Sequence, residues 1–411
     1  IPSFFKNRYR DHKNIIKIVS ASIIAVFFTV YTASAFSSGA KLFATLFSDS
    51  ASGDENYNRV YVIGLIVAAV VILVYTFMGG FKAVCTTDLI QGLMMIVAIL
   101  TVPVLAYAIL TFDTSFSSAL AAKGVEQPAQ FLNFFVNGDG TPVSAVSIIS
   151  NLAWGLGYFG MPHILVRFMA VKSNEEIKKS RKIAVVWVII SLTASCLIGL
   201  IARGYLTAQL DDATSESVFI RTIQQLFSGN GVLIFIGGIF LCGILAAIMS
   251  TADSQLLVTA SAVSEDLYKG AVKKNASEKS SLLVGKIAVA VVAVIAFFIA
   301  LNPKSSIMGL VSDAWAGFGS AFGPVVLLAL FWKRSTLSGA ISGMATGALT
   351  VIIWDYIPLV NGQTLYAATN LYSLVVGFGL ALIVNVIVSL FSKKPSKEIM
   401  DEFDSIKNIE V

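Results

Sequence analysis

The sequence has 411 residues, of which 56% are hydrophobic and 13% are charged, and its mean hydropathy is +0.81. A soluble core of this size cannot bury so much apolar surface, so the composition excludes an ordinary soluble domain and indicates an integral membrane protein. Only two histidines and three widely spaced cysteines occur. These counts disfavour both a metal centre and an enzyme.

Ten apolar segments are long enough to cross a hydrocarbon core of about 30 Å as helices. We expect these spans near residues 13 to 47, 57 to 78, 86 to 111, 143 to 171, 179 to 206, 230 to 267, 280 to 302, 307 to 332, 336 to 357 and 369 to 391. The opening "IPSFFKNRYRDH" lacks the pattern of a signal peptide, and we expect that the chain is truncated at its N-terminus.

The loops between these spans alternate in basic residues, as the positive-inside rule requires. One set of loops and ends holds eighteen Lys and Arg residues, and the opposite set holds four, or six if Lys41 and Arg203 near the span ends are included. The alternation predicts a multi-pass protein of the cell inner or plasma membrane with both termini cytoplasmic. The net charge of +5 therefore indicates topology more than a nucleic-acid patch.

Asp88 lies just inside the cytoplasmic end of the third span, in "CTTDLIQ". Ionisable residues within spans are costly and mark ion pathways in many transporters. For Asp88, and for Arg167 further along the chain, the alternative to a role in an ion pathway is a structural one, as a helix cap or as part of an ion pair.

The fourth span is interrupted. The stretch "WGLGYFGMPHILVRF", residues 154 to 168, has three glycines before Pro162, which cannot donate to the carbonyl of Tyr158. We expect the helix to open around Tyr158, because transporters use such breaks to present backbone groups to solute and ions. Trp154 and Tyr158, at i and i+4, could wall a small solute. A structural proline kink is the alternative.

Two external connections flank the pair formed by the fourth and fifth spans. Residues 112 to 142 are long enough for a lid or short surface helices. Residues 207 to 229 have helical periodicity at Phe219, Ile223 and Leu226, which predicts a helix over the outer face.

A polar stripe follows in "GILAAIMSTADSQLLVTASAVSED". Ala247, Ser250, Thr251 and Ser254 share one helix face at i, i+3, i+4 and i+7. Small residues allow close backbone approach, and hydroxyl and carbonyl oxygens suit a hard monovalent cation, with the Asp253 carboxylate nearby. Helix packing through small residues is the alternative.

The eighth span contains "VSDAWAGFGSAFGPVV", in which three glycines and a proline follow Ser312, Asp313 and Trp315 and loosen the helix. Ser312 and Trp315 are possible gate residues. Close packing through glycine is the competing explanation.

Four stretches, "FFTVYTASA", "WGLGYFGMPHILVRFMA", "MSTADSQLLVTASAVSEDLYKG" and "SDAWAGFGSAFGPVVL", together resemble the sodium:solute symporter family, and within it most closely the sodium/proline symporters. The resemblance covers nearly the whole chain in order. It implies an all-α integral membrane protein with the leucine-transporter-like inverted-repeat fold, in which two five-helix halves enclose solute and sodium sites. By that comparison the first helices of the family, including its first broken helix, are missing before residue 1.

The resemblance also divides the chain, residues 1–411, within one transmembrane domain. Residues 13–111 would be the remainder of the first repeat, and 143–332 the second repeat. Two additional helices at 336–391 and a cytoplasmic tail at 392–411 would complete the chain.

Family roles can be carried onto matching positions. The resemblance implies that Ala247, Ser250 and Thr251 form half of a sodium site and that Asp88 is linked to sodium passage toward the cytoplasm. It implies that the solute is bound by four residues, namely Tyr31, Trp154, Tyr158 and Pro162, the last through the shape of the break. Met161 stands where the sodium/proline symporters more often have glutamine, and this departure leaves the identity of the substrate open.

We therefore predict sodium-coupled import of L-proline by alternating access, with Na⁺, the solute and the lipid bilayer as partners and the oligomeric state open. A symporter for pantothenate, a monocarboxylate or a sugar would share the sodium stripe and change the aromatic wall. A transporter-like sensor would need a signalling domain, for which the tail after residue 391 is short. A passive channel would not have an occluded site between broken helices.

Overall fold

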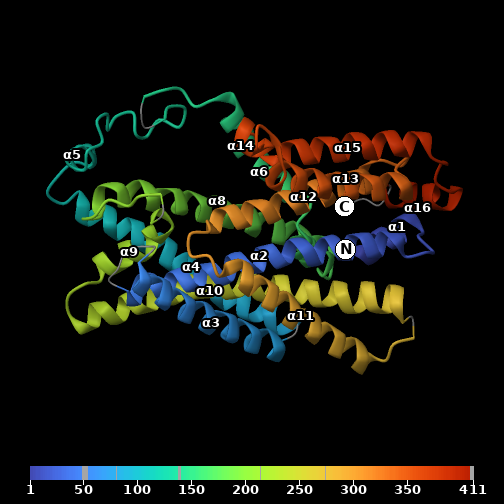
Figure 1. The fold of residues 1–411 in the computed structure, drawn as a ribbon, viewed down its shortest axis with the longest axis horizontal. Helices are drawn as coiled ribbons and strands as arrows, with labels where there is room; N and C mark the ends of the chain where they lie inside the picture. Colours follow the sequence, from blue (N-terminus) through green and yellow to red (C-terminus); the bar gives the residue numbers. More distant parts are fainter. Residues whose placement is uncertain (49–53, 80, 138–139, 213, 274, 408–411) are drawn as a thin grey trace.

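The computed structural model describes residues 1–48, 54–79, 81–137, 140–212, 214–273 and 275–407. The long helices lie along roughly the same axis and form one bundle (Figure 1). Short helices α1 (Pro2–Tyr9) and α16 (Lys397–Lys407) lie at one end of the bundle, called the α16 end. Helices α5 (Phe116–Ala122) and α9 (Val218–Leu226) lie at the opposite end, called the α9 end. Lys274, counted above among the loop residues, and the last four residues of the tail at 392–411 lie outside the described residues.

Nine helices in the described part of the chain are long and apolar enough to cross a membrane. They are α2 (Ile15–Phe47), α3 (Glu55–Met78), α4 (Phe81–Leu110), α8 (Asn174–Tyr205), α10 (Gly231–Ser261), α11 (Glu278–Ala300), α12 (Ile307–Phe331), α13 (Leu337–Tyr356) and α15 (Ser373–Phe391). Nine of the ten predicted spans are therefore present as long helices. Helix α10 continues without a gap into a π-helix, η2 (Ala262–Val272).

The remaining predicted span, over 143 to 171, is interrupted, as its glycines and Pro162 predicted. The segment forms two shorter helices, α6 (Ala145–Gly157) and α7 (Pro162–Met169), separated by four residues. Neither piece is long enough to cross the bilayer alone, because about 20 residues are needed. The cause is the one expected from the sequence: Pro162 cannot continue a helix that precedes it.

The short elements cap the bundle. The 3₁₀ turn η1 (Ser215–Ser217) leads into α9, whose predicted apolar face is confirmed: Phe219, Ile223 and Leu226 belong to a cluster around Val102 of α4. A hairpin, β1 (Pro358–Val360) and β2 (Gln363–Thr364), followed by α14 (Leu365–Thr369), was not expected from the sequence. Its turn residues Asn361 and Gly362 have φ values of 49° and 76°, the left-handed region that two-residue hairpin turns require.

Helix α12 is the centre of the bundle. In the most apolar stretch of α12, 78% of the residues are buried, compared with 11% in the peripheral helix α8. It packs on α2, α6, α13 and α15. A Cβ added at Gly317 would lie 2.1 Å from the ring of Phe27, and one at Gly319 would lie 2.8 Å from the Cα of Gly157. Close packing through glycine therefore brings α12 against α2 and against the end of α6, where the break begins.

Candidate functional site

The break between α6 and α7 is a tight, non-helical connection. Helix α6 ends at Gly157, and the amide of Gly160 donates to its carbonyl oxygen at 2.9 Å. Pro162 takes the first position of α7, where the missing N–H leaves no helical hydrogen bond unmade. The predicted opening around Tyr158 is thus present, and it is a full interruption of the helix, more than a kink.

Two glycines allow α12 to touch this break. A Cβ on Gly157 would lie 1.9 Å from Nε1 of Trp315, and a Cβ on Gly160 would lie 2.3 Å from the carbonyl oxygen of Phe318. No side chain fits at either position without displacing its neighbour. The glycines that loosen the helix are therefore also the contact surface for α12.

Aromatic side chains from three elements form a continuous stack beside the break, called here the aromatic wall: Trp154, Tyr158, Trp315 and Tyr372. The ring of Trp315 stacks on Trp154 at 5.3 Å with an interplanar angle of 14°, and meets Tyr158 edge-on at 4.9 Å. Tyr372, just before α15, also stacks on Trp154, with the ring centroids 6.1 Å apart. Trp315 Nε1 donates to the Trp154 carbonyl oxygen at 2.9 Å, which fixes α12 to α6.

Tyr31 belongs to the same core cluster as Trp154 and Trp315 but faces a different neighbour. Its ring meets the imidazole of His163 edge-on, with the centroids 6.3 Å apart. The structure therefore brings Trp154 and Tyr158 into one stack through Trp315 and places Tyr31 beside the first turn of α7. Ser312, predicted with Trp315 as a gate, accepts at its carbonyl oxygen a 2.7 Å hydrogen bond from the Tyr372 hydroxyl.

Sequence reasoning overlooked Tyr372 and His163 as members of this region. Tyr372 carries no periodic signal, because it precedes α15 and reaches Trp154 only through the packing of α15 on α6. His163 was set aside as one of only two histidines. Its position directly after Pro162, in the first turn beyond the break, was the available signal.

The predicted cation stripe is a compact oxygen-rich patch on α10. The hydroxyls of Ser250 and Thr251 both donate to the carbonyl oxygen of Ala247, at 3.2 and 3.0 Å. These contacts place two hydroxyl oxygens and one carbonyl oxygen close together, with hydroxyl lone pairs left to accept or to ligate. The arrangement suits a small hard cation, which prefers oxygen ligands.

A cavity of about 510 Å³, called here the cation cavity, opens beside this stripe. It lies between α4, α7, α8 and α10, and its polar lining includes Asp88, His163, Arg167, Ser250, Thr251 and Ser254. The stripe and the first turn of α7 therefore border the same space.

Asp88 and Arg167, two charges that the sequence left ambiguous, form an ion pair in this cavity. Nη2 of Arg167, which pairs with the Asp88 carboxylate, also donates to Ser254 Oγ at 2.8 Å. Nη1 donates to the carbonyl oxygen of His163 at 3.4 Å. One guanidinium thus ties α7 to both α4 and α10. The ion-pair alternative is correct for these residues as the structure has them, and a role in an ion pathway stays a prediction.

Asp253 lies next to Ser254 and has no exposed surface. Its Oδ1 accepts a long 3.4 Å hydrogen bond from Ser254 Oγ, and its Oδ2 has no partner among the described residues. Side-chain hydrogen bonding to this carboxylate is therefore limited, among the described residues, to one long contact.

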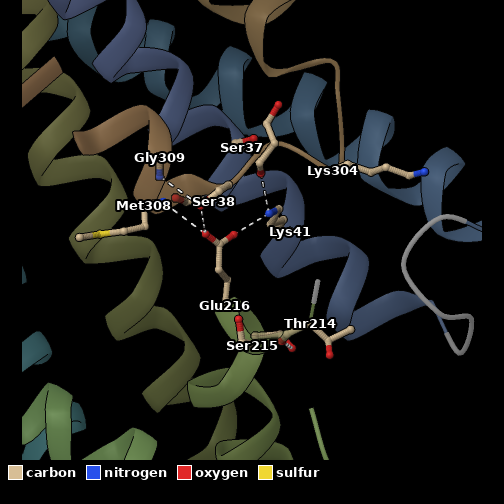
Figure 2. A network of polar contacts seen from close by, with 12 residues as sticks. Ser37, Ser38, Lys41, Thr214, Ser215, Glu216, Lys304, Met308 and Gly309 are labelled. Carbon is tan, nitrogen blue, oxygen red and sulfur yellow. Dashed lines mark hydrogen bonds and ion pairs between the residues drawn. The ribbon is translucent and has the colours of Figure 1, made fainter. Parts of the chain in front are cut away.

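A second polar network lies at the α9 end (Figure 2). The Glu216 carboxylate accepts hydrogen bonds from Lys41 Nζ at 2.6 Å, Ser306 Oγ at 2.9 Å and the Met308 amide at 3.2 Å. Lys41 Nζ also donates to the Ser305 carbonyl oxygen at 2.8 Å. Burial raises the pKa of Glu216, but the Lys41 charge and these hydrogen bonds outweigh burial, so the net pKa is lowered.

Comparison with known proteins gives consistent matches along the chain. A model of the sodium:solute symporter family matches residues 1–347. The sodium/proline symporter 2 of Staphylococcus saprophyticus is 42% identical over 417 residues, covering 100% of this chain and 76% of the relative. The sodium/proline symporter of Staphylococcus aureus is 41% identical with the same coverage.

A solved structure has a similar fold. It is a Na⁺-coupled sialic acid symporter in a substrate-bound outward-open state, and it aligns with a TM-score of 0.67 over 96% of this chain and 78% of its own. The sequence identity is 18%, so this likeness concerns the fold alone. The leucine-transporter-like fold expected from the sequence is confirmed. These comparisons do not bear out the expectation that the first helices of the family are missing.

Proposed function

The chain belongs to the sodium:solute symporter family, and on that premise we propose that it imports proline together with sodium by alternating access. Members of this family are transporters and not enzymes. The names of the relatives at 41% and 42% identity support proline as the solute. The observation in this molecule that carries the proposal is the cation cavity, which is bordered both by the hydroxyl stripe of α10 and by the first turn after the break.

Sodium binds, in this proposal, at Ala247, Ser250 and Thr251. Two hydroxyl oxygens and the Ala247 carbonyl oxygen lie together, and Ser250 and Thr251 line a cavity large enough for a partly hydrated ion. Asp88 attracts the ion along the cavity, and Arg167 competes for the same carboxylate. Sodium that approaches Asp88 must therefore weaken the link that Arg167 makes between α4 and α7.

Proline packs, in this proposal, against Trp154, Tyr158 and Tyr31, with Pro162 holding the break open. The compact apolar ring of proline and its secondary ammonium group both suit aromatic faces. Met161, the position that left the substrate open, has no exposed surface and lies in the core cluster. Its burial supports a structural role for Met161 in the break.

Trp315 and Ser312 serve as the gate. Trp315 closes the stack between Trp154 and Tyr158, and Ser312 accepts from Tyr372 at the edge of the same wall. Withdrawal of α12 would break both contacts together and open a path to the wall. The family fold supports such rocking of one bundle against another.

The orientation is part of the proposal. The excess of Lys and Arg in alternate loops supports both termini on the cytoplasmic side, which puts the α16 end in the cytoplasm. Residues 13–111 and 143–332 would then be the parts of the two repeats. Residues 336–391 add two helices, and 392–411 form the cytoplasmic tail.

Uptake of radiolabelled proline into proteoliposomes, with and without an inward sodium gradient, tests the proposal. The expected result is saturable uptake that requires sodium and is reduced by excess unlabelled proline. The same assay with pantothenate, lactate and glucose as competitors tests the alternative solutes. Sodium-dependent uptake of one of those compounds, without proline uptake, would discard the proline assignment and keep the sodium site.

A further inference from the structure

His163 contacts both halves of the candidate site. It is the second residue of α7, directly after the break. Its imidazole lies 5.7 Å from the ring of Phe28 and 6.3 Å from the ring of Tyr31, centroid to centroid. The same residue lines the cation cavity together with Ser250 and Thr251.

The imidazole is not explained by packing alone. Its Nδ1 is buried and has no hydrogen-bond partner among the described residues. An unpaired buried polar atom destabilises the folded state, and a phenyl ring would fill this place between two aromatic rings without that cost. A partner for the ring becomes available when the cavity holds hydrated sodium or a polar group of the solute.

The first turn of α7 is also mechanically connected to the cavity. Arg167 donates to the His163 carbonyl oxygen and pairs with Asp88 on α4. A change in cavity occupancy that disturbs this pair is therefore transmitted directly to the backbone that carries the imidazole.

We propose that His163 is a positioning residue that couples occupancy of the cation cavity to the placement of Tyr31, and so links sodium affinity to solute affinity. The contents of a filled cavity hydrogen-bond the imidazole and hold its ring against Tyr31. An empty cavity leaves the ring without that restraint. The inference rests on the proposed function, because it assigns the residue through which the two ligands influence each other.

The test measures the ratio of the solute KM at low sodium to the KM at saturating sodium, in proteoliposomes containing the whole chain. Coupling factors of this kind are about 5 to 150. His163→Phe keeps a ring against Phe28 and Tyr31 but has no nitrogen, so the ratio should fall at least about fivefold, toward one. His163→Asn keeps a polar group near the position of Nδ1, and should retain more of the ratio than the Phe variant.

The chain supplies its own control. His12, the other histidine, is exposed between α1 and α2, and His12→Phe should keep the wild-type ratio. Size-exclusion chromatography checks that each variant is folded. If the Phe variant is not recovered folded, His163→Leu, which also lacks nitrogen, replaces it.

The contrary result is specific. A packing role predicts the reverse order, with the Phe variant like wild type and the Asn variant impaired, and that order would overturn the inference. Failure of the proposed function has a different signature, since it is judged on wild-type protein. If wild type couples sodium to another solute, the ratio is measured with that solute. If wild type shows no sodium-dependent uptake of any of them, the proposed function falls and the inference falls with it.

Discussion

Gly155 and Gly157 are two residues apart on α6 but differ in their surroundings. A Cβ on Gly155 has no atom within 4 Å, whereas a Cβ on Gly157 would lie 1.9 Å from Nε1 of Trp315. Gly157→Ala should therefore displace Trp315 from the aromatic wall, at a cost of about 1–3 kcal/mol. Because 1.4 kcal/mol is about a factor of ten in affinity, the solute KM should rise about tenfold or more.

Gly155→Ala is the matched control for this change, since alanine stabilises a helix relative to glycine and meets nothing here. Solute uptake measured side by side should separate the two variants. Equal KM values would mean that the wall does not bind the solute.

The hydroxyls on α10 can be separated in the same way. Ser250→Ala or Thr251→Val removes an oxygen that shares the Ala247 carbonyl, and should raise the half-saturating sodium concentration about tenfold, the effect of losing about 1.4 kcal/mol. Ser254→Ala removes a hydroxyl that is hydrogen-bonded to Arg167 and Asp253, and should change the half-saturating sodium concentration much less. The measurement is initial uptake over a sodium series, and an equal effect of all three variants would move the cation site elsewhere.

Among the elements, the η1 turn is held in place by a charged contact. The side chains of Lys41 and Glu216 are only 12% and 21% exposed, and the carboxylate also caps the start of α12. Glu216→Gln keeps the shape and removes the charge, so the free energy of unfolding should fall by about 1–3 kcal/mol. Thermal unfolding in detergent measures the change. Asp212→Asn, an exposed acid in the same connection, should leave the Tm unchanged.

The same contact gives a pH dependence with a definite sign. Because the folded-state pKa of Glu216 is lowered, its contribution to stability is complete above the ordinary carboxyl pKa and is lost as the pH falls through the lowered value. The Tm difference between wild type and Glu216→Gln should therefore be constant near neutral pH and shrink in acid. A difference that grows as the pH falls would contradict the assignment.

For the whole molecule, the orientation can be tested by labelling from outside the cell. After replacement of Cys85, Cys196 and Cys242, a single cysteine is introduced at exposed positions of the two ends. A membrane-impermeant maleimide should label Asn133→Cys, in the connection before α6, in intact cells. It should label Ser405→Cys, on α16, only after permeabilisation. Labelling of both in intact cells would reject the proposed topology.

Features that depend on a few neighbouring residues were predictable from the sequence. The long helices follow from apolar length, because lipid leaves no partner for free backbone groups. The break follows from Pro162 and its glycines, and the hydroxyl stripe at Ser250 and Thr251 follows from the 3.6-residue period. Each is a local consequence of backbone chemistry.

Contacts between residues far apart in the chain were decided only by the tertiary structure. Trp315 completes a wall that begins at Trp154, 161 residues earlier, and Arg167 reaches Asp88 and Ser254 across 79 and 87 residues. No periodicity within one helix encodes such neighbours. They arise because α12, the most buried helix, packs through glycine against the broken pair. The sequence by itself determined where the helices cross and where one breaks; the packing of α12 and α10 around that break decided which side chains share a site.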